Sequence, residues 1–340
     1  MSILLEDFLF ISCADLPFNQ LKNKTILISG ASGFIASYLV KCLLFMNKYL
    51  RLNIKIIGIV KDREKAIKIL GKHKNLSLVI QDICNPIKVK GKVDIIIHAA
   101  SIASPKYFKE RPIDTLGANI FGTYNLLKLA GEKKVETFLF FSSGGVYGET
   151  KGKTTEKDYG YLDPLDSRSC YHESKRMGET MCMAWASEKK TPIRIIRPFH
   201  VYGPGMSLTD GRAIADFITN ILRGEDIIMR SDGSSVRSFC YIADFTLGLL
   251  TVLLKGKNNE AYNITNDKSR KSILDLAVML AKLFPNPKVI YVERENGDNY
   301  LISRVKDNNP NVDKLRTLGW KPYFNLKQGF RRTIKYFKSS

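Results

Sequence analysis

The chain has 340 residues, of which 44% are hydrophobic and 25% are charged. These values are typical of a folded globular protein, and the length suits a main domain with a smaller second one. No apolar run is long enough to cross a bilayer, and the acidic pair Glu6–Asp7 does not fit a secretory signal. We therefore expect a cytoplasmic protein with no membrane partner.

The basic residues exceed the acidic ones and give a formal charge of +20. Such a surplus can indicate a nucleic-acid-binding surface. Here, however, basic and acidic residues alternate, as in Lys61–Lys65, and no tract of five or six basic residues occurs. We therefore predict no nucleic-acid partner. The six cysteines lie far apart without a Cys-x-x-Cys pair, which argues against a metal site and against a disulfide framework.

Residues 1–22 are a predicted amphipathic extension that packs on the body of the chain or on a partner subunit. From residue 23 to 200, β-rich runs alternate with helical patterns. The predicted strands are 25–29, 54–60, 76–80, 93–97, 137–141 and 193–196, and the clearest predicted helices are 34–46 and 170–188. This alternation predicts an α/β fold with a parallel sheet that binds ligands at the carboxyl ends of its strands.

From residue 201 to 340 the pattern changes to shorter helices and strands separated by Asn- and Gly-rich turns. We predict that this part forms mainly a smaller C-terminal lobe. Its boundary is soft, because a strand or helix from this part could return to the main sheet.

A glycine pair, Gly30 and Gly33, stands where the first strand ends and a helix begins. Glycine lets the chain turn sharply there and lets a pyrophosphate approach the amides at the helix N-terminus. The third glycine of the general fingerprint is replaced by Ala36. A tight turn without a ligand is the alternative. The neighbours predicted to line the same dinucleotide site are Ser32, Phe34 and Ile35.

Later strand ends add further candidates for this site. Asp82 and Ile83 follow the third strand, where a carboxylate could meet an adenine amino group. Asn119, in a helix, has an amide that could break the helix ladder and hold a water. His98 is expected to be a packed strand-end residue. The small residues after it, which leave room for a ribose, are Ala99, Ala100 and Ser101.

The choice between NAD and NADP depends on the residues after the second strand. An NAD site places an acidic residue there to bond the ribose hydroxyls, and Asp62 could do so. Lys61 and Arg63 could instead clamp a 2′-phosphate. We predict NAD and keep NADP as the alternative.

Tyr171 and Lys175 lie four residues apart, so they share one face of a helix. Free tyrosine titrates near ~10, and a neighbouring ammonium lowers that pKa toward the range of a useful base. Lys175 could also hold a nicotinamide ribose. Ser143 follows a strand end and could bond the same substrate hydroxyl. Ser142, which precedes it, and Tyr171 are also predicted to contact the cofactor. A surface pair and turn-capping serines are the alternatives.

Motifs in a fixed order extend along the chain after the N-terminal extension. They are Gly30-x-x-Gly33-Phe34-Ile35, Asp82-Ile83, His98-Ala99-Ala100, Asn119-x-x-Gly122-Thr123, Ser142-Ser143-x-x-Val146-Tyr147-Gly148, Tyr171-x-x-x-Lys175, Arg197-Pro198-x-x-x-Tyr202-Gly203-Pro204, Arg237-Ser238-Phe239, Tyr241-Ile242-x-Asp244 and Ala261-Tyr262-Asn263-Ile264. With them, nearly the whole remaining chain resembles the extended short-chain dehydrogenase/reductase family of nucleotide-sugar epimerases, dehydratases and decarboxylases.

The resemblance implies a Rossmann-type sheet, a nicotinamide cofactor and a nucleotide-diphosphate sugar as substrate. It implies catalytic roles for Tyr171, Lys175 and Ser143, and a homodimer formed through the helices that hold Asn119 and Tyr171. Apolar contacts at such an interface could come from Met177, Met181, Met183 and Trp185.

The same resemblance places further residues at the ligands. Arg237 would reach the diphosphate, Pro198 and Phe199 would line the nicotinamide pocket, and His200 stands where many relatives carry asparagine beside the diphosphate. Further candidates for substrate contact are Gly144, Arg212 and Arg304, with structural ion pairs as the alternative for the two arginines.

The residues at positions 144 and 145, Gly144 and Gly145, help to decide which reaction is predicted. The resemblance implies an Asp-Glu pair there for a 4,6-dehydratase, and a glutamate at position 145 for a glucuronate decarboxylase. The glycines are expected to leave space and to supply no acid or base. Residues 171–180 and 208–217 nevertheless look similar to the decarboxylase branch.

We predict hydride transfer at the sugar C4, of epimerase type. The alternatives are a decarboxylase, a 4,6-dehydratase, and a 4-ketoreductase or 4-dehydrogenase. A non-enzymatic NAD(P)-binding regulatory or RNA-associated protein is the alternative of another class.

Overall fold

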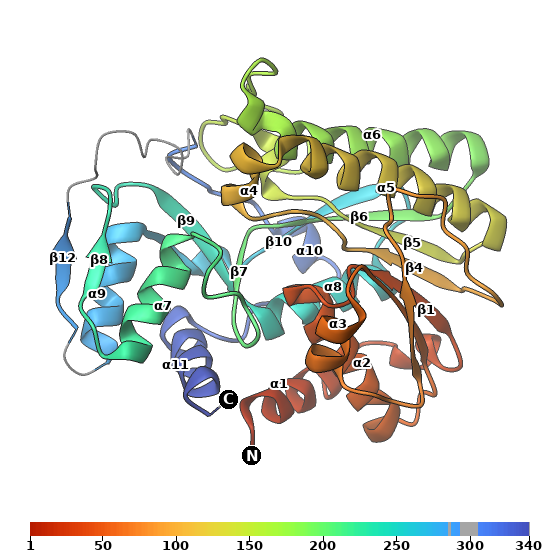
Figure 1. The fold of residues 1–340 in the computed structure, drawn as a ribbon, viewed down its shortest axis with the longest axis horizontal. Helices are drawn as coiled ribbons and strands as arrows, with labels where there is room; N and C mark the ends of the chain where they lie inside the picture. The colour runs from red at the N-terminus through yellow and green to blue at the C-terminus, as the bar shows by residue number, and fades with distance from the viewer. Residues whose placement is uncertain (285–286, 293–304, 340) are drawn as a thin grey trace.

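A parallel sheet of seven strands frames the computed structural model, which describes residues 1–284, 287–292 and 305–339 (Figure 1). The strand order is β10-β6-β5-β4-β1-β2-β3. The strands are β1 (Thr25–Ser29), β2 (Lys55–Val60), β3 (Leu76–Ile80), β4 (Ile95–His98), β5 (Thr137–Phe141), β6 (Ile193–Pro198) and β10 (Glu260–Ile264). Central strands such as β4 and β5 are buried along their whole length, which explains their unbroken apolar sequences. The predicted α/β fold with a parallel sheet is confirmed.

Helices cover both faces of this sheet (Figure 1). One face carries α4 (Pro105–Glu110), α5 (Pro112–Lys133) and α6 (Cys170–Lys189). The other carries α2 (Phe34–Tyr49), α3 (Arg63–Leu70) and α8 (Ile242–Lys255). The order of β1 to β6 reverses between β1 and β4, and an open α/β sheet binds its ligand at such a point.

A smaller lobe lies beyond the carboxyl ends of the central strands (Figure 1). Its sheets have the orders β11-β9-β7 and β12-β8. The strands are β7 (His200–Tyr202), β8 (Ile227–Met229), β9 (Val236–Tyr241), β11 (Arg270–Ser272) and β12 (Val289–Tyr291). The helices are α7 (Ala213–Arg223), α9 (Ile273–Leu283), α10 (Asp313–Arg316) and α11 (Leu326–Lys338).

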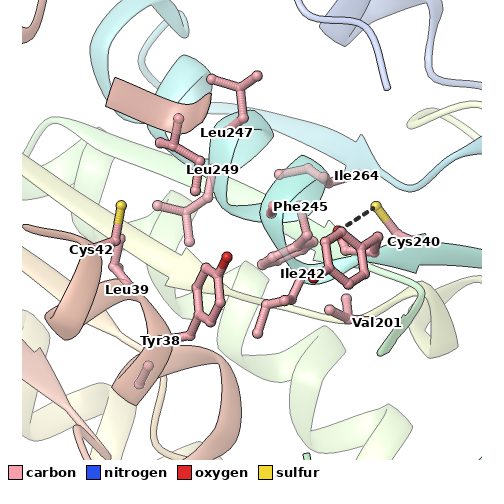
Figure 2. Packing of buried hydrophobic residues seen from close by; sticks show 14 of the residues in the cluster. Tyr38, Leu39, Cys42, Val201, Cys240, Ile242, Phe245, Leu247, Leu249 and Ile264 are labelled. Carbon is pink, nitrogen blue, oxygen red and sulfur yellow. Dashed lines mark hydrogen bonds between the residues drawn. The ribbon is translucent and has the colours of Figure 1, made fainter. Parts of the chain in front are cut away.

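The core is continuous between the lobe and the main sheet. β10 pairs with β6, and α8 packs under the sheet, so both return from the region after residue 200. Figure 2 shows Tyr38 and Leu39 of α2 in one cluster with Ile242 and Phe245 of α8. One hydrophobic core therefore includes residues from both sides of residue 200. The division of the chain into two domains at that residue stays a prediction.

The N-terminal extension folds as a helix, α1 (Ile3–Ser12), which packs on α2, α8 and α11. Its Asp7 is fully buried and accepts hydrogen bonds from Tyr38 at 3.0 Å, Tyr241 at 2.7 Å and Arg332 at 2.6 Å. The extension therefore packs on the body of its own chain. No helix in the described part is both long and apolar enough to span a membrane.

Candidate active site

The turn between β1 and α2 is built for a close approach of the backbone. Gly30 has a φ of +65°, and a Cβ on it would lie 2.7 Å from the Cα of Ala100. Gly33 then precedes α2 in an extended conformation, and no side chain caps the helix. The first amides of α2 therefore lack a side-chain partner, which suits a bound phosphate oxygen.

The end of β4 is held beside this turn by a buried hydroxyl. Ser29 Oγ accepts hydrogen bonds from the amides of Ala99 and Ala100, both at 3.1 Å, and lies 2.9 Å from His98 Nδ1. His98 Nε2 lies 3.0 Å from the hydroxyl of Thr123. Both ring nitrogens of His98 are thus used inside the protein, and the expectation of a packed strand-end histidine fits this geometry.

Two buried polar atoms near this turn have no hydrogen-bond partner within the described ranges, namely Ser101 Oγ and Asn119 Oδ1. The amide nitrogen of Asn119 donates to Ser174 Oγ at 2.9 Å and so joins α5 to α6. The expected break of the helix at Asn119 is wrong, because α5 continues through it. Buried polar atoms without partners are costly, so both are candidate ligand contacts.

The residues after β2 and β3 pair with each other. Asp82 binds the Lys61 ammonium at 2.7 Å and the Cys84 amide at 2.9 Å. Burial raises the Asp82 pKa, but the bonds from Lys61 and Cys84 outweigh it and hold the pKa below its ordinary value. Asp62 is exposed and caps α3 through the Lys65 amide. Lys61, a candidate clamp for a 2′-phosphate, is thus held by a carboxylate.

Ile83 packs against α5 with its side chain, and its carbonyl accepts a hydrogen bond from Asn125 Nδ2 at 2.9 Å. A Cβ on Gly122 of α5 would lie 2.4 Å from Ile83 Cδ1. The glycine in the Asn119-x-x-Gly122 motif is therefore needed to let α5 approach the segment after β3.

The structure brings Tyr171, Lys175 and Ser143 together at the start of α6. The Lys175 ammonium donates to the Phe141 carbonyl at 2.7 Å and lies 5.9 Å from the centre of the Tyr171 ring. Burial lowers the Lys175 pKa to about 7. Burial raises the Tyr171 pKa above its ordinary value, and the Ser143 hydroxyl and the charge of Arg212 offset only part of that rise. The expected lowering of this pKa by the Lys175 ammonium is wrong, because Lys175 is not among the groups that shift it.

Ser142 bonds Glu179 and not Tyr171, Lys175 or Ser143. Its hydroxyl donates to Glu179 at 2.5 Å, and Glu179 forms a buried ion pair with Arg197 at 2.6 Å. Arg197 also donates to Tyr147 Oη at 2.8 Å. The sequence interpretation missed this network, although Glu179 stands four residues after Lys175 on the same helix face. Its effect is to fix the loop that carries Ser143.

The expectation that Gly144 and Gly145 leave open space is wrong. A side chain at 144 would begin 2.5 Å from Phe199 Cε1, and one at 145 would begin 2.0 Å from His172 Cδ2. Two aromatic rings therefore fill the volume that longer side chains would take. His172 was missed because its sequence position gives no indication that it meets Gly145.

The ring of Tyr171 is also covered from α4. Phe108 stacks on it with ring centres 4.7 Å apart and planes inclined by 12°. No sequence pattern indicated this contact. On the lobe side, Pro198 ends β6 beside Ile264 of β10, next to the Phe199 ring.

Positive charge from the lobe gathers around His200. Burial, and then the charges of Arg237 and Arg212, hold the His200 pKa well below its ordinary value. His200 Nδ1 is buried and has no hydrogen-bond partner in the described part of the chain. Arg212 also pairs with Asp210 at 3.4 Å and donates to the Ala103 carbonyl at 2.9 Å, so the structural alternative applies to it in part. Guanidinium donors near an unpaired ring nitrogen suit an anion. Arg304, the remaining predicted anion contact, lies outside the described residues.

Comparison with known proteins confirms the family that the motifs predict. The model of the NAD dependent epimerase/dehydratase family matches residues 26–265. UDP-glucuronic acid decarboxylase 1 of Danio rerio is 32% identical over 93% of this chain and 73% of its own length. UDP-glucuronic acid decarboxylase 3 of Arabidopsis thaliana is 34% identical over 90% of this chain and 87% of its own.

Solved structures agree on the fold. UDP-glucuronic acid 4-epimerase from Bacillus cereus, in complex with UDP-glucuronic acid and NAD, has a TM-score of 0.77 and 26% identity, covering 93% of this chain and 99% of its own. An epimerase from Methanothermobacter thermautotrophicus has a TM-score of 0.80 at 21% identity, covering 99% and 96%. The similar sequences are thus decarboxylases, whereas these structures are epimerases.

Proposed function

Because the chain belongs to the NAD dependent epimerase/dehydratase family of enzymes, we propose that it oxidises C4 of a nucleotide-diphosphate sugar and completes an epimerase-type reaction there. The observation that carries the proposal is the position of the Tyr171 ring beside Ser143 and 5.9 Å from the buried Lys175 ammonium. These groups lie where the central strands of the sheet end, the place at which such sheets bind ligands.

The residues around the β1–α2 turn fit NAD. Gly30 and Gly33 leave the amides of α2 open to a pyrophosphate, and the buried oxygens of Ser101 and Asn119 have no partner among the described residues. NAD, when bound, accepts the hydride that C4 releases. The other residues that we propose as contacts are Ser32, Phe34, Ile35, Asp62, Asp82, Ile83, Ala99, Ala100, Lys175 and Pro198.

Tyr171 would take the proton of the C4 hydroxyl. Burial disfavours the phenolate, so the group needs compensation before it can act as a base at neutral pH. Ser143 and the charge of Arg212 supply part of that compensation, and the pKa still stays above its ordinary value in the protein without ligands. Ser143 would also bond the substrate hydroxyl and hold it within reach of Tyr171.

The cluster of His200, Arg212 and Arg237 would hold the diphosphate. Arg237 is buried, and one of its nitrogens is used by the Val236 carbonyl at 2.8 Å. The planar guanidinium retains further donors for phosphate oxygens. His200 Nδ1 would accept or donate one more hydrogen bond, in the place where relatives have an amide.

The epimerase type is supported by the residues that the site lacks. Gly144 and Gly145 supply no acid or base for a reaction at C5 or C6. A decarboxylase is the second candidate, because UDP-glucuronic acid decarboxylases share 30–34% of their residues with this chain. Both reactions begin with the same oxidation at C4.

We also propose a homodimer formed by the outer faces of α5 and α6. Phe121 and Tyr124 of α5 and Met177 of α6 are exposed large apolar side chains. Met181, Met183 and Trp185, also expected at this interface, are partly buried against the core of their own chain. Exposed apolar residues gathered on neighbouring helices are typical of an association surface.

A panel of UDP-, dTDP-, GDP- and CDP-sugars followed by NMR tests the proposed function. The expected product is a C4 epimer; with UDP-glucuronate, release of CO2 and a UDP-pentose would instead support the decarboxylase. Mass spectrometry of the released cofactor separates NAD from NADP. Absence of any change at C4 across the panel would contradict the proposal.

A further inference from the structure

His172 and any side chain at position 145 exclude each other. A Cβ at 145 would lie 2.0 Å from Cδ2 and 2.6 Å from Nε2 of the imidazole. Real Cβ atoms do not approach other atoms so closely, and the volume can hold only one of the two groups. In this chain, the imidazole from α6 takes the place of a side chain on the loop after β5.

This place borders the catalytic group. The Gly145 amide donates to Ser143 Oγ at 3.1 Å, so the imidazole lies beside the Ser143 turn. The ring of His172 also stands edge-on to Tyr171, with centres 5.5 Å apart, and to Phe108 at 6.1 Å. His172 is therefore held between the two residues that meet the C4 hydroxyl in the proposed function.

The ring nitrogens of His172 form no hydrogen bond with any described residue, and the side chain is partly exposed. Burial and the charge of Arg176 lower the His172 pKa to about 4, so the imidazole is neutral at physiological pH. A neutral imidazole carries one donor and one acceptor, which match a sugar hydroxyl.

We propose that His172 is a substrate-contacting, specificity-determining residue that hydrogen-bonds a hexose hydroxyl next to C4. This inference rests on the proposed function. It assigns to α6 a substrate contact beside the loop after β5, where the imidazole fills the volume next to Gly145. The alternative is that the ring only fills space.

His172→Phe separates these two roles, because phenylalanine keeps a ring of similar shape and removes both nitrogens. His172→Ala removes the ring as well. The matched control is His73→Phe, since His73 is exposed and lies after α3, away from the site. KM and kcat are measured with UDP-glucose and UDP-glucuronate, the affinity for NAD by calorimetry, and folding by circular dichroism.

We expect His172→Phe to raise KM about tenfold, the effect of one lost hydrogen bond. Its kcat and NAD affinity should stay near those of the wild type, as should all values of His73→Phe. A wild-type KM in folded His172→Phe would overturn the inference and leave only packing. If the wild-type enzyme changes neither sugar at C4 nor any other in the panel, the proposed function itself fails.

Gly145→Ala provides a reciprocal test. The added methyl should displace the imidazole and raise KM to a similar extent. In a His172→Ala background the same methyl has room, so it should add no further increase. An unchanged KM in Gly145→Ala, or additive effects in the double variant, would also contradict the inference.

Discussion

The buried ammonium of Lys175 lowers the stability of the folded protein, and we propose that it is kept for the chemistry of the site. Lys175 is 1% exposed, so its ammonium has lost most of its hydration water. One carbonyl and the rings of Phe140 and Tyr171 contact the ammonium in place of that water. Burial accordingly lowers its pKa to about 7. A position chosen for stability alone would hold an apolar residue.

The cost of this buried ammonium should depend on pH. Unfolded lysine titrates near ~10.4, above the value in the folded protein. Below pH 7 Lys175 is charged in both the folded and the unfolded chain, so the full loss of folding stability from burying the ammonium is present. Between pH 7 and ~10.4 the unfolded chain holds a proton that the folded chain has released, so stability rises with pH.

We therefore predict that Lys175→Met is more stable than the wild type at pH 7, by at most about 5 kcal/mol. The difference should shrink steadily as the pH approaches 10. Urea unfolding at pH 7, 8, 9 and 10 measures it. Lys68→Met, at an exposed position of α3, is the control and should show no such trend. A Lys175→Met difference that does not change with pH would contradict the argument.

The sequence indicated the residues of the site better than their contacts. The spacing of Tyr171 and Lys175 depends only on helix geometry, so it could be predicted. Ser142 bonding Glu179, and the aromatic rings over Gly144 and Gly145, depend on how β5, β6 and α6 approach each other. Such contacts arise from tertiary packing and leave no local pattern.

Strands and helices could be predicted where burial gives the sequence a regular pattern of apolar residues. β1 and β5 have the predicted bounds, because short apolar runs between turns indicate buried strands. β3 also has the predicted bounds, but the expectation that it is buried is wrong, because it lies at the edge of the sheet and its residues are partly or fully exposed. The three-residue strands of the lobe were not individually predicted. Their pairing depends on neighbours such as β9, and a run of three residues carries too little periodicity to indicate a strand.

At the level of elements, α1 is joined to the rest of the molecule through Asp7. The carboxylate receives hydrogen bonds from α2, β9 and α11, through Tyr38, Tyr241 and Arg332. Tyr241 ends the strand that carries Arg237. The N-terminal helix therefore supports the strand that we propose to hold the diphosphate.

Asp7→Ala should destabilise the protein by about 3–5 kcal/mol, because it leaves the Arg332 guanidinium without its buried partner. Equilibrium urea unfolding at neutral pH measures the effect. Glu6→Ala is the matched control: Glu6 binds the same arginine at 2.8 Å from a partly exposed position and should lose only about 1 kcal/mol. An equal decrease in the free energy of unfolding in the two variants would contradict this prediction, because the buried contacts of Asp7 would then stabilise the protein no more than the partly exposed contact of Glu6.

At the scale of the whole molecule, the proposed dimer explains an apolar surface that the single chain leaves exposed. Phe121 is 61% exposed in the middle of α5, where the opposite face packs on the sheet. Phe121→Lys should shift the protein from dimer to monomer, because a charge would enter the centre of an apolar interface.

Sedimentation velocity measures this shift. Tyr159→Lys, at a comparably exposed aromatic residue in the loop before α6, is the control and should remain dimeric. A monomeric wild type, or a dimeric Phe121→Lys, would contradict the proposed interface without affecting the chemistry.

Tyr171→Phe tests the central claim most directly, since it removes one oxygen and keeps the ring stacked on Phe108. The measurement is turnover of the sugar that the panel identifies, together with the amount of cofactor retained by the purified variant. We predict turnover reduced by at least about a hundredfold, with the same cofactor content as the wild type. Undiminished turnover in the variant would contradict the role of Tyr171 as the proton acceptor at C4.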